Sequence, residues 1–278
     1  MKKRFLLSVL MLISFIFIGN GEGGVLSVSG EKTDKEKERL LGPVKTVLIE
    51  MAEMSEKDGK WVAGTRMPWT STTYDSQGRR IEEDQLYNDE PLNFKSVFIY
   101  DANGRLKEGV EYDYQGVIAF TWSYIHETET KMIEERYRPD GSLFSKSIYL
   151  YDPEGNLIEE TRSHTQTANG FKWVYRYDKA GKKVEESFYL IRSKGLPNQT
   201  GTSLNYRSVY SYDDKGRLTE ETQYDPAGGV KSEQKFRYEY DDEGNWTSQT
   251  AWQRGDSDGR AAFEPIDVTY RTITYYPQ

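Results

Sequence analysis

The chain of 278 residues contains no cysteine and only two histidines, His126 and His164. The absence of cysteine excludes a disulfide framework, and it excludes lipid attachment to a cysteine that follows a signal sequence. Two histidines without cysteine also offer no ligand set for a zinc or iron site. The sequence has neither a Gly-x-Ser-x-Gly motif nor a glycine-rich phosphate loop. We therefore expect no cofactor.

Long hydrophobic runs are scarce, and the one that stands out lies at the N-terminus. Lys2, Lys3 and Arg4 precede the apolar residues 5–18, and small residues follow. This order is typical of a secretory signal peptide, and the run is shorter than the roughly 20 residues that span a bilayer. We predict a signal peptide over residues 1–21, cleaved after Gly21 or Ser29, with a retained membrane anchor as the alternative. The mature protein would be periplasmic, secreted or on the cell surface, with no membrane span and no cysteine-linked lipid.

Basic residues are outnumbered, so the chain has a formal net charge of −8. An acidic chain is poorly suited to nucleic acid or to anionic lipid surfaces, both of which attract basic proteins. Only 36% of the residues are hydrophobic, yet the chain has 21 tyrosines, 11 phenylalanines and 6 tryptophans. This aromatic content is unlike that of disordered chains and favours thin β-sheets, in which aromatic side chains form cross-strand pairs.

One ten-residue phrase recurs through the chain. YDPEGNLIEE, which begins at Tyr151, has near copies elsewhere; all share Tyr-Asp-x-x-Gly, and the full unit reads Tyr-Asp-x-x-Gly-x-Leu. The repeat positions are Tyr74, Asp75, Gly78; Tyr100, Asp101, Gly104, Leu106; Tyr151, Asp152, Gly155, Leu157; Tyr177, Asp178, Gly181; Tyr212, Asp213, Gly216, Leu218; and Tyr240, Asp241, Gly244. The longest steps between units contain insertions at residues 163–176 and 190–211.

The unit predicts a β-hairpin. Asp suits the first position of a type I turn, and Gly three residues later accepts the left-handed backbone of a bulge. Counting across the turn places Tyr151 opposite Leu157, an aromatic–aliphatic pair that stabilises antiparallel strands. Counting on in steps of two, we expect the face that begins at Leu218 to hold Glu220, Thr222 and Tyr224. The phrase is therefore a building block rather than a site.

The hairpins predict an all-β fold, an elongated antiparallel meander of repeated β-hairpins that can curl on itself. We expect a linker at residues 22–43, in which the charged residues 31–40 are a linker or a short helix. A β-hairpin head should follow at 44–73, the repeat array at 74–249 and a closing hairpin at 250–278. The unit resembles the YD repeat of the RHS family, which occurs in toxin-bearing and adhesive shell proteins. The resemblance implies a β-rich exported protein with a short array, without carrying over a toxin domain.

Paired acids recur at one repeat position: Glu82–Glu83, Glu134–Glu135, Glu159–Glu160, Glu185–Glu186 and Glu220–Glu221. Glycoside hydrolysis uses two carboxylates about 5 to 10 Å apart with different environments. Adjacent strand residues point to opposite faces, and a repeat gives each copy similar surroundings. We therefore interpret the pairs as a solvated acidic face, with weak cation binding along the carboxylates as an alternative.

The segment RGDSDGR (254–260) suggests two kinds of site. Arg254, Gly255 and Asp256 form an adhesion tripeptide, and Asp256 and Asp258 before Gly259 resemble the start of a calcium loop. Asp256 and Asp258 are our candidate metal ligands, although a plain turn explains the same residues.

Tryptophans on a flat sheet form a stacking platform for sugar rings. Trp173, Trp246 and Trp252 are the candidate ligand-binding residues, with packing into the sheet as the alternative.

We therefore expect a non-enzymatic exported binding or scaffold protein. Arrays of similar units present a broad surface rather than a single pocket. The partner would be a polymer (a glycan) or a protein, bound by the sheet face and the loop insertions. A self-associating spacer or shell component is the first alternative. A carbohydrate hydrolase that uses Asp256, Asp258 or Glu264 is the second.

Overall fold

The computed structural model describes residues 33–87, 93–165, 169–193, 200–254 and 262–277, which form β-strands and one short helix. The predicted signal peptide lies outside the described residues. The elements are α2 (Asp34–Lys37), β1 (Val44–Lys57), β2 (Lys60–Ala63), β3 (Met67–Tyr74), β4 (Arg80–Gln85), β5 (Phe94–Tyr100), β6 (Leu106–Asp113), β7 (Ile118–Thr128), β8 (Lys131–Tyr137), β9 (Leu143–Tyr151), β10 (Leu157–His164), β11 (Gly170–Tyr177), β12 (Lys183–Ser193), β13 (Thr200–Tyr212), β14 (Leu218–Tyr224), β15 (Val230–Tyr240), β16 (Trp246–Arg254) and β17 (Phe263–Tyr275).

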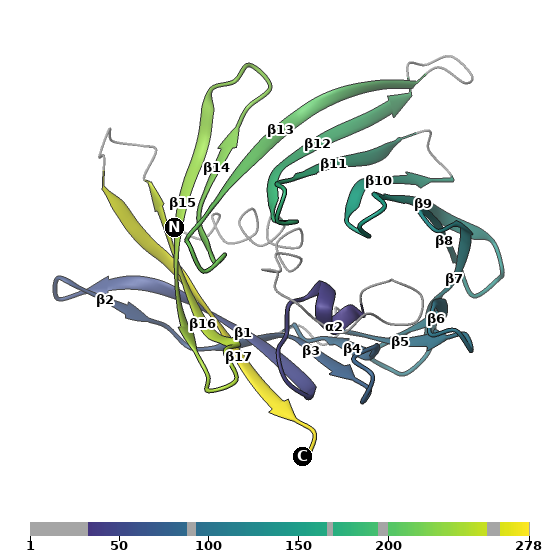
Figure 1. Cartoon of the computed structure of the whole chain (residues 1–278), viewed down its shortest axis with the longest axis horizontal. Helices are drawn as coiled ribbons and strands as arrows, with labels where there is room; N and C mark the ends of the chain where they lie inside the picture. Colours follow the sequence, from purple (N-terminus) through teal and green to yellow (C-terminus); the bar gives the residue numbers. More distant parts are fainter. Residues whose placement is uncertain (1–32, 88–92, 166–168, 194–199, 255–261, 278) are drawn as a thin grey trace.

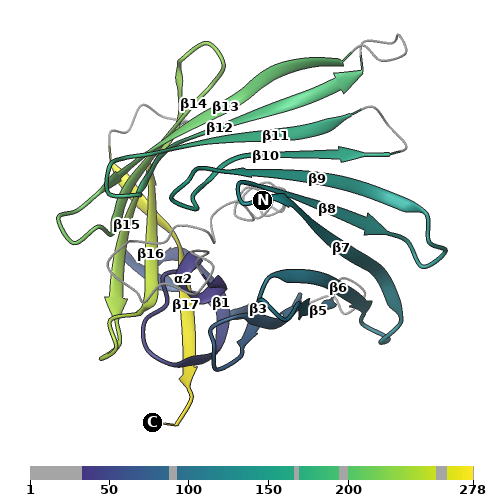
Figure 2. The ribbon, with the colours of Figure 1, turned by 45° about the vertical axis from the view of Figure 1, so that its right-hand side comes forward.

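The strands close into a ring, which Figures 1 and 2 show from two directions. From β3 to β17 each strand pairs antiparallel with the next, and β1 pairs with both β17 and β3, so sixteen of the described strands form a closed barrel. The short β2 extends β1 as a separate hairpin. The all-β antiparallel prediction is confirmed, but the sheet is closed rather than an elongated open meander. Closure pairs the edges that an open sheet would expose, and Val47 opposite Ile273 lies on this seam.

The repeat units form the predicted hairpins. In the first unit the Gly78 N–H donates to the Asp75 carbonyl (3.0 Å), and the Asp75 N–H donates to the Arg79 carbonyl (2.9 Å). The Asp75 carboxylate accepts from the N–H of Gln77 (2.9 Å), and Gly78 has φ +82°, which a β-carbon would disfavour. Tyr151 lies opposite Leu157, as predicted.

The six YD turns predicted from the sequence lie at one end of the ring. Successive hairpins of an antiparallel sheet lie at alternate ends. Each of these six turns joins an odd-numbered strand to the next even-numbered strand, so all six lie at the same end. We call this end the YD end; it consists of turns 75–78, 101–104, 152–155, 178–181, 213–216 and 241–244. The predicted insertions are largely strands rather than loops, because Gly170–Tyr177 forms β11 and Thr200–Tyr212 forms β13. At the opposite end, turns 113–116 and 225–228 have the same Tyr-Asp-x-x-Gly sequence and the same backbone hydrogen bonds. The repeat is therefore not confined to one end of the ring.

The bulge beside each YD turn changes which residues share a face. Leu218 pairs with Tyr212, but Glu220 pairs with Ser211, and the register shifts between them. The predicted face of Leu218 with Glu220 is therefore wrong: Leu218 shares its face with Glu221 instead. Leu218 and Glu221 are both buried, because this face lines the inside of the ring. A bulge inserts one extra residue and so reverses the alternation beyond it.

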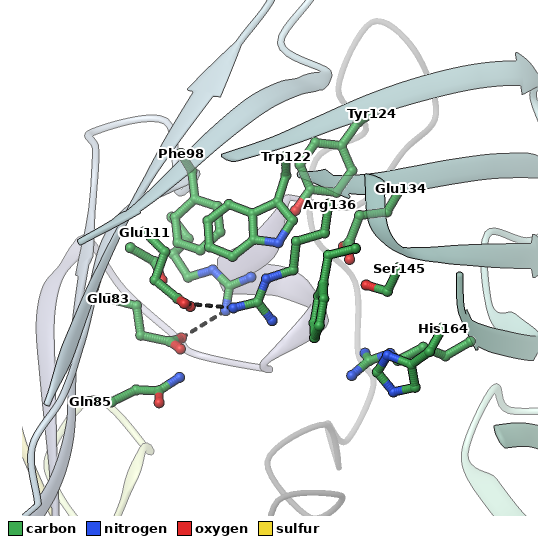
Figure 3. A pocket seen from close by; sticks show the side chains of 14 residues that line it. Glu83, Gln85, Phe98, Glu111, Trp122, Tyr124, Glu134, Arg136, Ser145 and His164 are labelled. Atoms are coloured by element: carbon green, nitrogen blue, oxygen red, sulfur yellow. Dashed lines mark hydrogen bonds and ion pairs between the residues drawn. The ribbon is translucent and has the colours of Figure 1, made fainter. Parts of the chain in front are cut away.

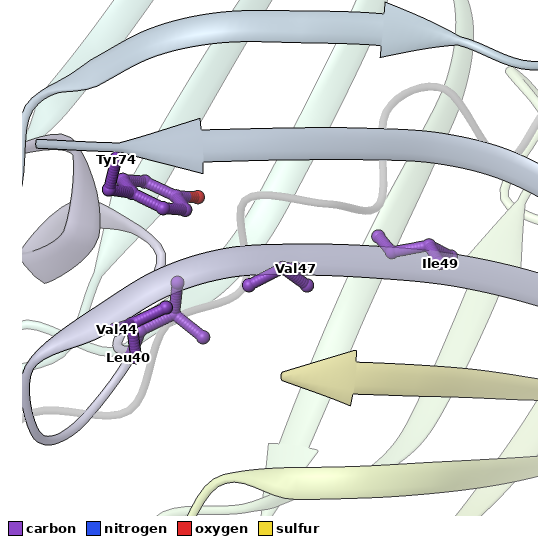
Figure 4. Packing of buried hydrophobic residues seen from close by; sticks show 5 residues of the cluster. All are labelled: Leu40, Val44, Val47, Ile49 and Tyr74. Atoms are coloured by element: carbon purple, nitrogen blue, oxygen red, sulfur yellow. The ribbon is translucent and has the colours of Figure 1, made fainter. Parts of the chain in front are cut away.

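The N-terminal segment packs inside the ring near the YD end (Figure 1). Thr33 caps α2, and the Lys35 N–H donates to the Gly78 carbonyl over 2.9 Å. Tyr74 is fully buried and donates its phenol hydrogen to Glu38 (2.5 Å). The short-helix alternative for residues 31–40 thus matches the described part, and the segment makes core contacts. Figure 4 shows this core, formed by Leu40, Val44, Val47, Ile49 and Tyr74.

Among the described residues, no helix combines the length and apolar character needed to cross a membrane.

Candidate functional site

A nearly continuous row of aromatic side chains crosses the inner wall from β5 to β13. We call it the aromatic belt; it consists of Phe98, Phe120, Trp122, Phe144, His164, Phe171, Trp173, Phe188 and Tyr206. Ring centroids are 4.9 Å apart for Phe120 and Phe144, and 5.4 Å apart for Phe144 and His164. Further along the wall, Phe188 lies 5.0 Å from Trp173. These separations are typical of interacting aromatic pairs.

Strand alternation places the belt on one face. Phe120 and Trp122 are two residues apart on β7, so both point inward. The Trp122 ring also needs space on the neighbouring strand β6, because a β-carbon at Gly109 would lie 2.5 Å from this ring. Gly109 therefore gives Trp122 room to lie flat against β6.

The first half of the belt lines a cavity of about 260 Å³ between β4 and β10, which Figure 3 shows. Its wall combines aromatic rings with guanidinium, carboxylate, amide and hydroxyl groups. The lining residues are Arg80, Glu83, Gln85, Ser96, Phe98, Glu111, Trp122, Tyr124, Glu134, Arg136, Phe144, Ser145, Arg162 and His164. The expectation of a broad surface without a pocket is therefore wrong, because closure of the ring turns one sheet face into a concave wall.

Each of two arginines is held between a carboxylate and a ring. Arg80 donates to Glu83 over 2.8 Å, and its guanidinium lies 4.3 Å from the centre of the Phe98 ring. Arg136 donates to Glu111 over 2.6 Å and lies 3.8 Å from the Phe120 ring. Burial raises the pKa of Glu111, although Arg136 opposes this effect. Stacking on the rings fixes both guanidinium groups at the cavity wall.

A second polar cluster lies further round the inner wall. Lys183 donates to Glu186 over 2.9 Å, and Tyr206 donates to the same carboxylate over 3.3 Å. Glu221 is 4% exposed, and burial raises its pKa to about 7. The predicted solvated acidic face is therefore only half right, because one member of each acidic pair points inward.

The other members face outward and form ion pairs with cations on the next strand. Glu82 pairs with Lys95 (2.7 Å), and Glu220 pairs with Lys235 (2.9 Å). The outer wall is therefore crossed by rows of opposite charges.

The structure does not gather the three predicted tryptophans on one surface. Trp173 belongs to the belt, but Trp246 lies elsewhere on the inner wall, where the Arg271 guanidinium is 3.7 Å from its ring. Trp252 pairs in register with Lys235 on the outer face, 5.2 Å from the Arg237 guanidinium. Sequence reasoning missed the cavity residues, although the alternating aromatic residues FTWSY at 120–124 were a usable signal.

The candidate metal ligands Asp256 and Asp258 lie outside the described residues. Within the described ranges, no group of three or more His, Asp or Glu side chains is arranged to hold a metal ion.

Comparison with solved structures finds proteins to which this chain is similar. A porin-like protein from Bacteroides uniformis ATCC 8492 is 13% identical with a TM-score of 0.50, over 84% of this chain and 98% of that one. A porin-like protein from Bacteroides vulgatus ATCC 8482 is 11% identical with a TM-score of 0.42, over 84% and 99%. TcdB2-TccC3 without its hypervariable C-terminal region is 15% identical with a TM-score of 0.23, over 72% of this chain and 12% of that one.

No curated protein matches the chain. The family model described as RHS Repeat matches residues 212–256, which contain the Tyr-Asp-x-x-Gly turns that begin at Tyr212, Tyr224 and Tyr240. The same Tyr-Asp-x-x-Gly hairpin recurs at the other YD turns, as predicted. The chain therefore contains RHS, or YD, repeats.

Proposed function

We propose that the protein is an exported, non-enzymatic binding protein that takes a glycan chain along the aromatic belt of its inner wall. The observation that carries this proposal is the belt itself, with Trp122 and Phe144 lining the cavity. Sugar rings have apolar faces that stack on aromatic side chains. Ligand sites combine such apolar walls with a few placed polar groups.

The polar part of the cavity also suits a sugar. Each hydroxyl group both donates and accepts hydrogen bonds. Arg136 supplies donors, Gln85 supplies both, and Glu134 supplies an acceptor, all within one cavity. A purely apolar ligand would leave these groups without partners, which costs free energy.

The inward acids support a binding role over hydrolysis. They recur at one repeat position, and a hydrolase needs two carboxylates with different environments. Glu160 has Arg162 beside it (3.1 Å), and Glu186 has Lys183 (2.9 Å). Glu221 differs, because its pKa is raised to about 7 by burial, so it is the residue to test for any hydrolytic activity.

Export is supported by the basic and apolar N-terminus described above. The outer wall suits contact with water, because Lys146 pairs with Glu135 (3.0 Å) and Lys172 with Glu159 (2.7 Å) on that face.

The test is binding of residues 30–278 to a glycan and peptidoglycan panel, with and without calcium. The proposal expects saturable binding to a glycan, no released sugar products and no calcium requirement. Product release that Glu221→Gln abolishes would contradict the non-enzymatic role. A blank panel would contradict glycan binding, and light scattering would then test self-association.

A further inference from the structure

The cavity on the inner wall contains an unusual concentration of arginine for an acidic chain. Arg80, Arg136 and Arg162 all line the same space of about 260 Å³, and His164 lies beside them. The whole sequence has a formal net charge of −8. A cluster of guanidinium groups inside such a protein needs a chemical reason.

The hydrogen-bond donors of two of these arginines exceed the acceptors that the protein provides. A guanidinium has five N–H donors in a planar fork. Arg80 donates through Nη1 to Glu83, and Arg136 donates through Nη2 to Glu111. Among the described residues, the Nε of each of these two arginines is buried without a partner. Because both Nε atoms are themselves buried, the donors that can face a ligand are the terminal Nη groups of these arginines.

The neighbouring carboxylates are turned toward protein partners. Glu111 has a side chain that is only 9% exposed and accepts from Arg136. Glu134 accepts from the Tyr149 phenol over 3.2 Å, and Glu160 accepts from Arg162 over 3.1 Å. Glu111 and Glu160 hold Arg136 and Arg162 in place, so these two acids have less acceptor capacity left for a ligand.

In two of the three arginine–glutamate pairs the guanidinium group is the more exposed member, whereas Arg80 and Glu83 are equally exposed at 23%. The Arg162 side chain is 44% exposed, against 14% for its partner Glu160. Arg136 is 25% exposed, against 9% for Glu111. In both pairs the cation is therefore the more accessible member.

We propose that this cavity, the arginine cavity, binds an oxyanion carried by the sugar: the carboxylate of a uronic acid or a sulfate ester. A planar guanidinium fork matches such groups through two parallel hydrogen bonds. The aromatic walls at Trp122 and Phe144 would hold the sugar ring that carries the anion. This inference rests on the proposed function and narrows its ligand to acidic glycans.

The experiment is calorimetric binding of three probes to residues 30–278: trigalacturonic acid, a sulfated heparin disaccharide and neutral maltotriose. The expected result is that at least one acidic probe binds ten-fold or more tightly than maltotriose, with affinity that falls as salt rises. Preference for trigalacturonic acid identifies a carboxylate ligand, and preference for the heparin disaccharide identifies a sulfate ligand.

The variants are Arg136→Gln, Arg136→Lys and the outer-wall control Arg237→Gln. Arg136→Gln should weaken acidic binding at least ten-fold, Arg136→Lys should weaken it less, and Arg237→Gln should leave it unchanged. If Arg136→Gln fails to fold, Arg136→Lys decides, because it keeps the charge but loses the fork.

Two results would overturn the inference. One is maltotriose binding as tightly as both acidic probes, with no response to Arg136→Lys; the glycan-binding proposal would survive that result. The other is the absence of acidic binding at millimolar concentration, whatever the glycan panel shows.

Discussion

The phenol of Tyr212 donates a hydrogen bond of 2.6 Å to the backbone carbonyl of Lys183, 29 residues earlier in the chain. Tyr177 makes the same bond to the Leu157 carbonyl (2.8 Å). In each case the acceptor follows the preceding YD turn of the ring. The repeated tyrosine is thus an inward-pointing link between consecutive units.

Loss of one link should cost the energy of one partly buried hydrogen bond. Tyr177→Phe removes the phenol but keeps the ring, so we expect the free energy of unfolding to fall by about 1 kcal/mol. The control is Tyr114→Phe, because the Tyr114 side chain is 49% exposed. Urea unfolding measures the free energy of unfolding of both variants. A loss for Tyr177→Phe as small as that for Tyr114→Phe would contradict the linking role.

The glycine of each YD turn should be required for its backbone rather than for space. Gly155 has φ +81°, and a β-carbon there would meet nothing within 4 Å. Gly155→Ala should therefore destabilise by about 1 kcal/mol through backbone strain alone. Gly155→Asn should cost less, because asparagine adopts the left-handed region more readily. Equal thermal stability of the alanine variant and the native chain would show that the turn relaxes.

The N-terminal segment should be part of the folded core. Leu40 is 3% exposed, whereas its neighbour Leu41 is 50% exposed. Leu40→Ala should lower the free energy of unfolding by about 2 to 5 kcal/mol through lost burial and a cavity. Leu41→Ala should change it by less than about 0.5 kcal/mol. Denaturant titrations measure both free energies of unfolding. Equal changes for Leu40→Ala and Leu41→Ala would mean that the N-terminal segment is not packed into the core.

Glu221 should make stability depend on pH. Its folded pKa is about 7 because of burial, above the ordinary value of 4.5, so the folded state holds this proton more tightly. The free energy of unfolding should therefore fall as pH rises from about 4.5 to about 7, by roughly 3 kcal/mol at most. Lys183 and Glu186 face the same cluster and also contribute to the local charge.

The substitution Glu221→Gln should remove this slope and raise stability above pH 7. The control Glu220→Gln changes the outward neighbour, which is 48% exposed and should leave the slope intact. Unfolding at pH 4.5, 6 and 8 gives the comparison. A slope that persists in Glu221→Gln would assign it to another group.

The local structure was predictable because the turn chemistry is local. Asp75 and Gly78 specify a bulged hairpin from four consecutive residues, and Tyr151 opposite Leu157 follows by counting. The face of Glu220 was not predictable by alternation, because the bulge adds one residue and reverses it.

Ring closure and the cavity depend on partners far apart in sequence. The alternating pattern of residues around Val47 predicts a strand, but the neighbouring sequence does not indicate that Val47 pairs with Ile273. The cavity then follows from closure, since Arg80 and Arg136 reach one space only when the sheet curves. For the same reason, the sequence does not distinguish Trp173, which lies on the inner wall of the ring, from Trp252, which lies on the outer wall.

The central claim is that the inner wall binds the ligand, and these two tryptophans test it most directly. The measurement is the affinity of Trp173→Ala and of Trp252→Ala for the glycan that the panel identifies. The account predicts a loss of ten-fold or more for Trp173→Ala and no change for Trp252→Ala. Loss of affinity in Trp252→Ala with none in Trp173→Ala would place binding on the outer wall and contradict the account.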